Sequence, residues 1–118
     1  MDSIIETKSL DFAIRIVKLG NYLQSSKNEY IMSNQIIKSG TSIGANVAEA
    51  QYAQSNNDFI SKLSIARKET NETNYWLKLL KETEYISYKE FDSLFSDIDE
   101  IHKILSSIIL SSKDKTND

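Results

Sequence analysis

No proline interrupts this chain, so the residue that most reliably ends a helix is missing from all 118 positions. Glycine occurs only three times, and apolar residues recur at steps of three and four along most of the sequence. That spacing is typical of amphipathic helices that bury one face. The sequence therefore predicts an all-α protein whose helices pack against one another.

The size of the chain sets its domain organisation. A chain of 118 residues is long enough to form one hydrophobic core. We predict a single domain over residues 1–118, with a polar tail at 111–118 that frays. Cysteine is absent, which excludes disulfides and thiolate metal sites and favours a reducing, cytoplasmic location. No apolar run reaches the roughly 20 residues of a membrane-spanning helix, and no membrane association is expected.

The first helical segment has a wide apolar arc, and we expect it to contact two neighbours. Its polar side carries Asp11, Arg15, Lys18 and Tyr22. The apolar side consists of two stripes at helical spacing, namely Leu10, Ala13, Ile14 and Val17 for one, and Phe12, Ile16, Leu19 and Leu23 for the other.

Three serines mark the expected starts of the later helices. Ser33 is predicted to cap a second helix over about residues 34–53, with Met32 packing on Ile37 as a hydrophobic staple. The pairs Ser55–Asp58 and Ser87–Glu90 have the spacing of capping boxes for a third and a fourth helix. Four helices with short connections predict an antiparallel up-down-up-down four-helix bundle.

The segment SGTSIGANVAEA, residues 39–50, places two of the three glycines inside a predicted helix. Glycine costs a helix interior roughly 0.5 to 1 kcal/mol relative to alanine, so its presence indicates a need for space. The spacing matches no phosphate-binding loop. Gly40, Gly44 and Ala48 recur every four residues, which predicts a groove that admits another helix closely, the third segment being the expected partner.

Polar residues also follow the second segment at helical spacing, at Ser42, Asn46 and Glu49. A solvated helix face is one interpretation. The other is a semi-buried line of hydrogen-bonding groups, or a subunit interface, with Arg67 as one candidate partner for Glu49 and with Glu72 as a further member. The sequence leaves both open.

Catalytic and metal chemistry find little support in the sequence. Asp99 and His102 have a carboxylate-x-x-His spacing, but a di-iron bundle needs several such groups and this chain has one histidine. We predict that His102 lies at the edge of the core. An enzyme would need clustered carboxylates, for instance around Glu49 and Glu72, beside a nucleophile or base that the sequence does not indicate. We expect a non-enzymatic protein without catalytic residues, metal or cofactor.

The charge balance bears on nucleic-acid binding. The chain has 14 Lys and Arg residues against 17 Asp and Glu residues, a net charge of −3. Nucleic-acid-binding proteins usually carry a basic excess, so a non-enzymatic scaffold or adaptor is the favoured function. The alternative is an RNA- or DNA-associated protein with a local basic patch on the third helix, formed by Lys62, Arg67, Lys68, Lys78 and Lys81.

A longer constellation of residues resembles a known bacterial family. It comprises Gln35, TSIGANVAE at Thr41–Glu49, DFI at Asp58–Ile60, IA at Ile65–Ala66, and Glu72. In these positions, which span much of the chain, the sequence is similar to the ribosomal RNA intervening-sequence proteins. That family was first recognised as open reading frames inside insertions in bacterial 23S ribosomal RNA genes.

The resemblance implies an antiparallel four-helix bundle that assembles as a ring-like homopentamer with a central channel, and it implies no catalytic residue. One relative, the accessory protein of diversity-generating retroelements, is strongly basic and binds nucleic acid and a reverse transcriptase. Five copies of this −3 chain would instead carry −15. The sequence RKE at Arg67–Glu69 also departs from the small Gly-Ser-type step of many members.

Overall fold

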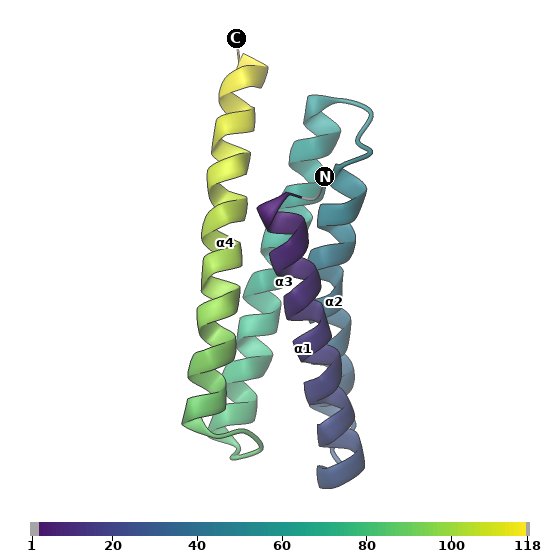
Figure 1. Ribbon diagram of the computed structural model, residues 1–118, viewed down its shortest axis with the longest axis vertical. Coiled ribbons are helices and arrows are strands. Elements are labelled where there is room, and N and C mark those ends of the chain that lie inside the picture. The colour runs from purple at the N-terminus through teal and green to yellow at the C-terminus, as the bar shows by residue number, and fades with distance from the viewer. Residues whose placement is uncertain (1–2, 118) are drawn as a thin grey trace.

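The computed structural model describes residues 3–117, and their side chains as far as residue 115. Four long helices run alternately up and down, and the molecule measures 51 × 24 × 21 Å (Figure 1). Each helix packs on the next in chain order, and α1 also contacts α4 to close the bundle. The predicted antiparallel up-down-up-down four-helix bundle is confirmed. The helices are α1 (Ile4–Lys27), α2 (Ile31–Ala50), α3 (Asn56–Glu82) and α4 (Tyr88–Asn117).

The core lies where the four apolar stripes meet. On α1 the buried stripe is Phe12, Ile16 and Leu23, one of the two that the sequence predicts. The predicted stripes of α3 and α4 also face inward, because apolar residues at steps of three and four return to the same side of a helix. Their buried members are Leu63, Ala66, Thr70, Thr73, Leu77 and Leu80 on α3, and Phe91, Leu94, Ile98, Ile101, Leu105 and Ile109 on α4.

Side-chain caps start α3 and α4 where the sequence predicts them. Ser87 Oγ accepts the Glu90 N–H at 3.1 Å, and Glu90 Oε1 accepts the Ser87 N–H at 3.2 Å, which completes a capping box. At α3, Ser55 Oγ accepts the Asp58 N–H at 3.0 Å. In a complete capping box the Asp58 carboxylate would accept the N–H of Ser55. Here it accepts the N–H of the preceding residue, Gln54, at 3.2 Å.

The predicted start and end of the second helix are wrong by about one turn. The helix covers Ile31–Ala50, and Ser33 lies inside it with its Oγ donating to the Glu29 carbonyl at 2.8 Å. The N-terminal N–H groups are satisfied by the Glu29 carboxylate, which accepts from Ile31, Met32 and Ser33 at 2.8 to 3.2 Å. A glutamate reaching forward from the preceding turn thus replaces the serine cap, because its longer side chain spans the distance.

The helices end in two different ways. α1 and α3 stop at left-handed residues, with φ of 53° at Asn28 and 67° at Glu84. α2 has no such stop, since Gln51 keeps a right-handed φ of −66°. The segment 111–117, which the sequence predicts to fray, continues the regular helix of α4, and the last residue of that predicted tail, Asp118, lies outside the described residues.

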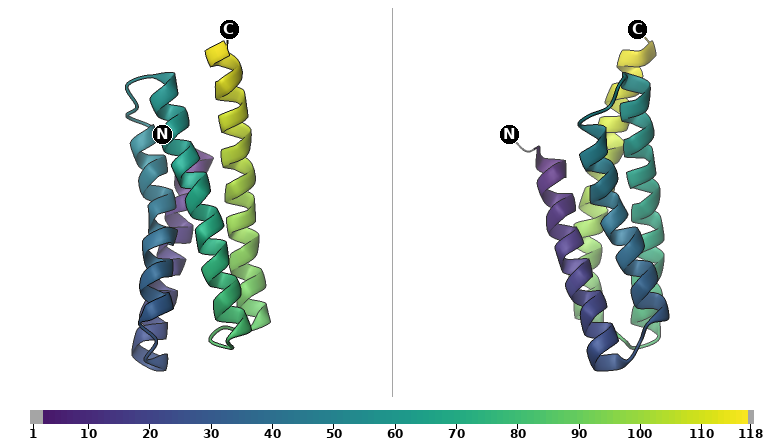
Figure 2. Two further views of the ribbon diagram at one scale, coloured as in Figure 1. Left: turned by 180° about the vertical axis from the view of Figure 1, so that it is seen from behind. Right: turned by 90° about the vertical axis from the view of Figure 1, so that its right-hand side faces the viewer.

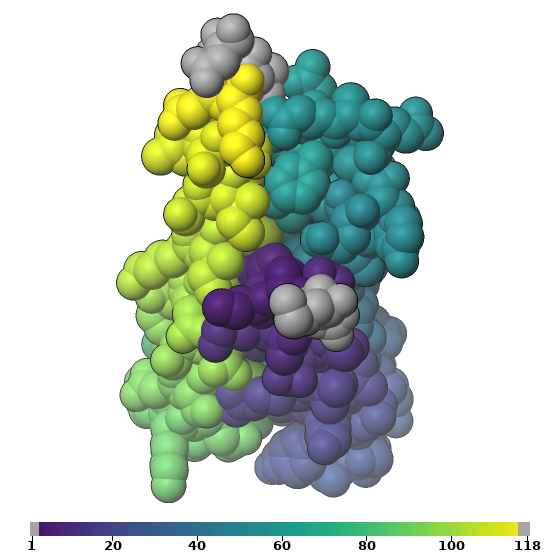
Figure 3. Space-filling view, turned by 45° about the horizontal axis from the view of Figure 1, so that its top comes forward, coloured from purple at the N-terminus to yellow at the C-terminus, as the bar shows by residue number. Residues whose placement is uncertain are grey.

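The four helices are not equally close along their length. In the right-hand view of Figure 2, α1 and α2 meet at their connecting turn and diverge toward the N-terminal end of α1. The space-filling view of Figure 3 shows this end of α1 at the surface between α4 and the α2–α3 pair. One flank of α1 therefore faces α2 and the other faces α4.

Candidate functional site

The two glycines of α2 lie against α1. A Cβ on Gly40 would come within 2.7 Å of Ile16 Cγ2, and one on Gly44 would come within 3.3 Å of the Ser9 carbonyl oxygen. The predicted close-packing groove is therefore present, but the prediction that α3 is its partner is wrong. The small residues of α3 contact another side of α2, where Thr73 Oγ1 donates to Ser39 Oγ at 2.9 Å.

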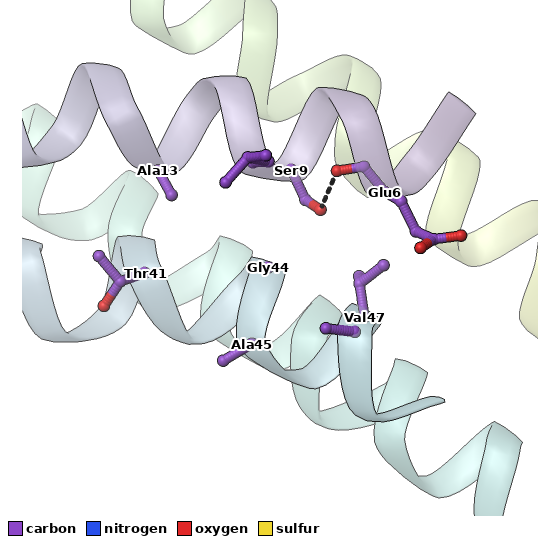
Figure 4. Close-up of a pocket in the computed structure, with 9 residues that line it drawn as sticks. Glu6, Ser9, Ala13, Thr41, Gly44, Ala45 and Val47 are labelled. Carbon is purple, nitrogen blue, oxygen red and sulfur yellow. Dashed lines mark hydrogen bonds between the residues drawn. The ribbon is translucent and has the colours of Figure 1, made fainter. Parts of the chain in front are cut away.

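The third member of the predicted groove, Ala48, is exposed where the two helices diverge. It borders a groove of about 340 Å³ between α1 and α2, with Gly44 and Ala45 on one wall and Leu10 and Ala13 on the other. Figure 4 shows the labelled residues of α1 and α2 facing each other across this space, with Ser9 Oγ donating to the Glu6 carbonyl. The lining is mostly apolar because the small side chains of α2 leave the aliphatic side chains of α1 uncovered.

The second apolar stripe of α1 is only partly covered in the bundle. Leu10, Ile14 and Val17 are 60%, 45% and 39% exposed. The two neighbours predicted for this helix are present, but α2 and α4 contact its other sides. These side chains project beside the groove. We call this surface the α1–α2 face, and it consists of Leu10, Ile14 and Val17 on α1 with Thr41, Ala45 and Ala48 on α2.

The polar line of α2 is half-buried at two positions and exposed at the third. Ser42 Oγ and Asn46 Nδ2 donate to carbonyls of their own helix, at 2.6 and 2.9 Å. The Glu49 carboxylate lies 3.7 Å from Lys62 Nζ, so the predicted pairing with Arg67 is wrong. Arg67 points instead toward α4, where it donates to Ser106 Oγ at 3.5 Å.

Glu72 was predicted as a further member of this polar line, but its hydrogen bond is to a residue of its own helix. Its carboxylate accepts the Trp76 indole N–H at 3.3 Å within α3. Burial raises the pKa of the neighbouring Glu69, and the negative charge of Glu72 adds to that effect, against Lys68 and Lys38. The two carboxylates that the sequence analysis considers for an enzyme, Glu49 and Glu72, are both exposed.

The five basic residues predicted as a nucleic-acid patch do not form one cluster on α3. Lys62 faces Glu49, and Arg67 faces α4. Lys81 lies 4.0 Å from the centre of the Phe91 ring and 3.6 Å from the Glu82 carboxylate. Lys68 and Lys78 are exposed, but ten residues at the rise of an α-helix separate them by about 15 Å.

His102 is half-buried at the edge of the α4 stripe, as predicted. Asp99, which has the spacing of a ligand relative to it, forms an ion pair with Lys103 at 2.9 Å. Among the described residues, no three acidic, histidine or cysteine side chains gather as metal ligands would. Within residues 3–117, no helix combines the length and hydropathy needed to cross a bilayer.

Together these features define a class of protein, a four-helix bundle with an unpartnered apolar face beside a close helix contact. The family profile of 23S rRNA-intervening sequence proteins matches residues 1–107, and the chain belongs to that family. A crystal structure of a protein of unknown function from the S23 ribosomal protein family of Bacteroides thetaiotaomicron VPI-5482 is similar, with 55% sequence identity and a TM-score of 0.89. The match covers 90% of this chain and 98% of that one. No curated protein matches the chain.

The sequence predicts the buried stripes and the helix caps, but it does not predict that the second apolar stripe of α1 is exposed. The wide apolar arc of α1 is a sequence signal for such a surface, because it offers more apolar side chains than one neighbour covers. Spacing does not reveal that α2 and α4 both pack toward the side of α1 that carries Phe12 and Ile16. The stripe at Leu10, Ile14 and Val17 is therefore left at the surface.

Proposed function

We propose that this protein is a non-enzymatic scaffold or adaptor that assembles into a homo-oligomer through the α1–α2 face. The observation that carries the proposal is the exposure of Leu10, Ile14 and Val17 on one helix face. Apolar side chains gathered on the surface of a small protein mark interaction sites, because covering them removes apolar area from water.

The shape of the face favours a second copy of the chain as the occupant. Leu10, Ile14 and Val17 form a ridge of branched side chains, and Ala45 and Ala48 border a shallow groove directly beside it. The ridge of one copy fits the groove of another, since small residues admit bulky ones. In a ring, the same contact repeats from copy to copy until the rotation closes. The family resemblance makes a pentamer the expected ring.

Light scattering after size-exclusion chromatography tests this proposal. We expect a mass near five times the 13.5 kDa of the chain. Ile14→Glu should reduce the mass toward that of the monomer, because it places a charge in the centre of the ridge. Leu110→Glu is the matched control, since Leu110 is 65% exposed on α4, away from the α1–α2 face. A wild-type mass of one chain would contradict self-assembly.

Nucleic-acid binding remains the alternative function. It has weaker support, because the net charge is −3 and the five cations of α3 are dispersed. A gel shift at low salt with single- and double-stranded RNA and DNA distinguishes the two functions. We expect no shift at micromolar protein, and a shift that weakens steeply with salt would favour the alternative.

A further inference from the structure

A second concave region lies on the other flank of α1, between α1 and α4. Its volume is about 490 Å³, which is within the range of small-molecule sites. We call it the α1–α4 pocket. Its apolar residues are Leu19, Tyr22 and Leu94, and its cationic residues are Arg15, Lys18 and Lys89.

The charges around this pocket are opposite in sign to the charge of the chain. Three cations stand against one acidic lining residue, Glu90, while the whole chain is −3. The Glu90 carboxylate accepts the Ser87 N–H at 3.2 Å in the cap of α4, a contact that orients this carboxylate without offsetting its charge. Arg15, Lys18 and Lys89 counted against Glu90 and the Asp97 that pairs with Arg15 leave a net charge of +1, so the pocket is weakly positive on a negative chain and favours an anion.

The three cations differ in what holds them. Arg15 bridges the two walls, since its guanidinium donates to Asp97 Oδ2 at 2.5 Å and to Ser93 Oγ at 2.9 Å. Lys18 on α1 and Lys89 on α4 form no ion pair with any residue in the described part of the chain. Arg15 thus serves to position the walls, and the two lysines are the groups available to a ligand.

We propose that the α1–α4 pocket binds a small amphipathic carboxylate. Its carboxylate would pair with Lys18 and Lys89, and its hydrocarbon part would cover Leu19, Tyr22 and Leu94. An apolar floor with cations at the rim fits a molecule that has one charged end and one apolar end. This site is separate from the α1–α2 face, so it does not depend on self-assembly.

Decanoate is the probe for this proposal. We expect it to bind saturably in a calorimetric titration, and to shift the amide NMR signals of Tyr22, Ser93 and Leu94. Nonyltrimethylammonium has the same alkyl chain and the opposite charge, and we expect it to bind at least about tenfold more weakly, which corresponds to about 1.4 kcal/mol. Equal binding of both probes would reduce the site to a hydrophobic surface and overturn the proposal.

Substitutions locate the site. Lys18→Gln with Lys89→Gln should weaken decanoate binding about tenfold without unfolding the protein, because both side chains lie at the surface. The matched control is Lys68→Gln with Lys78→Gln, two exposed lysines of α3, which should leave binding unchanged.

A second variant tests the pocket without removing a charge. Ser93→Phe places a ring in the space and should abolish binding, while circular dichroism confirms that the bundle is intact. The proposal is overturned if decanoate does not bind at millimolar concentration, if the lysine pair has no effect, or if folded Ser93→Phe protein binds normally.

Discussion

The two flanks of α1 are held in opposite ways. On the α2 side the backbones come close, because Gly40 leaves room for Ile16 and Gly44 lies under the Ser9 carbonyl. On the α4 side long charged side chains bridge a wider space, with Lys8 paired to Glu100 and Arg15 paired to Asp97. A buried steric fit and an exposed ionic bridge therefore stabilise the same helix.

The difference predicts where stability resides. Steric fit in a core tolerates little change, because added atoms have no space to occupy. Ion pairs at the surface are screened by water and salt, and they contribute little to the free energy of unfolding. We therefore expect the α1–α2 contact to dominate stability, and the α1–α4 contact to be replaceable. Two substitutions test this comparison, and a third provides a reference.

Gly40→Leu should have the largest effect. A Cβ at this position already collides with the buried Ile16, so a leucine forces α1 away from α2. We expect a loss of about 3 kcal/mol in the free energy of unfolding, which outweighs the roughly 1 kcal/mol gained in helix propensity. Urea denaturation measures it, with Gln35→Leu, at an exposed position of the same helix, as the control. Equal stabilities of Gly40→Leu and the parent would show that the helices are not closely packed here.

Arg15→Gln tests the other flank and should have a smaller effect. The side chains of Arg15 and Asp97 are 41% and 43% exposed, so water screens the pair. We expect a loss of about 0.5 to 1 kcal/mol, and less in high salt. Lys78→Gln, at an exposed position of α3, is the control. A loss comparable to that of Gly40→Leu would break the comparison, because the ionic flank would then matter as much as the packed one.

Glu69→Gln provides a reference outside both flanks and should have the smallest effect. The pKa of Glu69 is raised in the folded state, so the folded protein binds this proton more tightly than the unfolded chain does. The resulting stability is full below the ordinary pKa of a glutamate and is lost as the pH rises through the raised pKa. Glutamine avoids that loss and should stabilise the protein by at most about 0.5 kcal/mol near neutral pH.

Urea denaturation at about pH 7 and about pH 4 measures this effect of Glu69→Gln. The gain should shrink at the lower pH, where the wild-type carboxyl takes up its proton. Glu84→Gln, at an exposed position, is the matched control. A gain that is the same at both pH values would assign the effect to packing rather than to charge.

The fold was predictable because its signals are local. The stripes of α3 and α4, and the capping box of Ser87 and Glu90, specify helices without reference to distant residues. The start of α2 was mispredicted because Ser33 resembles a cap, whereas the Glu29 side chain performs that role from outside the helix. A long side chain that reaches forward leaves no spacing that distinguishes it from an ordinary surface glutamate.

The candidate site was only partly predictable, because it depends on how the helices are arranged. Spacing alone indicated a groove at Gly40 and Gly44, but it could not tell whether α1 or α3 fills it. The same limit applies to the α1–α4 pocket. Arg15 and Lys18 were assigned to a polar side of α1, and only the bundle brings Lys89 of α4 beside them.

The left-handed residues Asn28 and Glu84 lie in the turns of two helical hairpins, α1–α2 and α3–α4. Each hairpin has a left-handed residue in its turn. The connection between the hairpins, residues 51–55, contains neither a left-handed residue nor a buried one. This makes the connection the natural place to cut the protein. Two separately produced halves, joined by no peptide bond, should find each other through the α2–α3 contact, so the chain is also a ready framework for a split reporter.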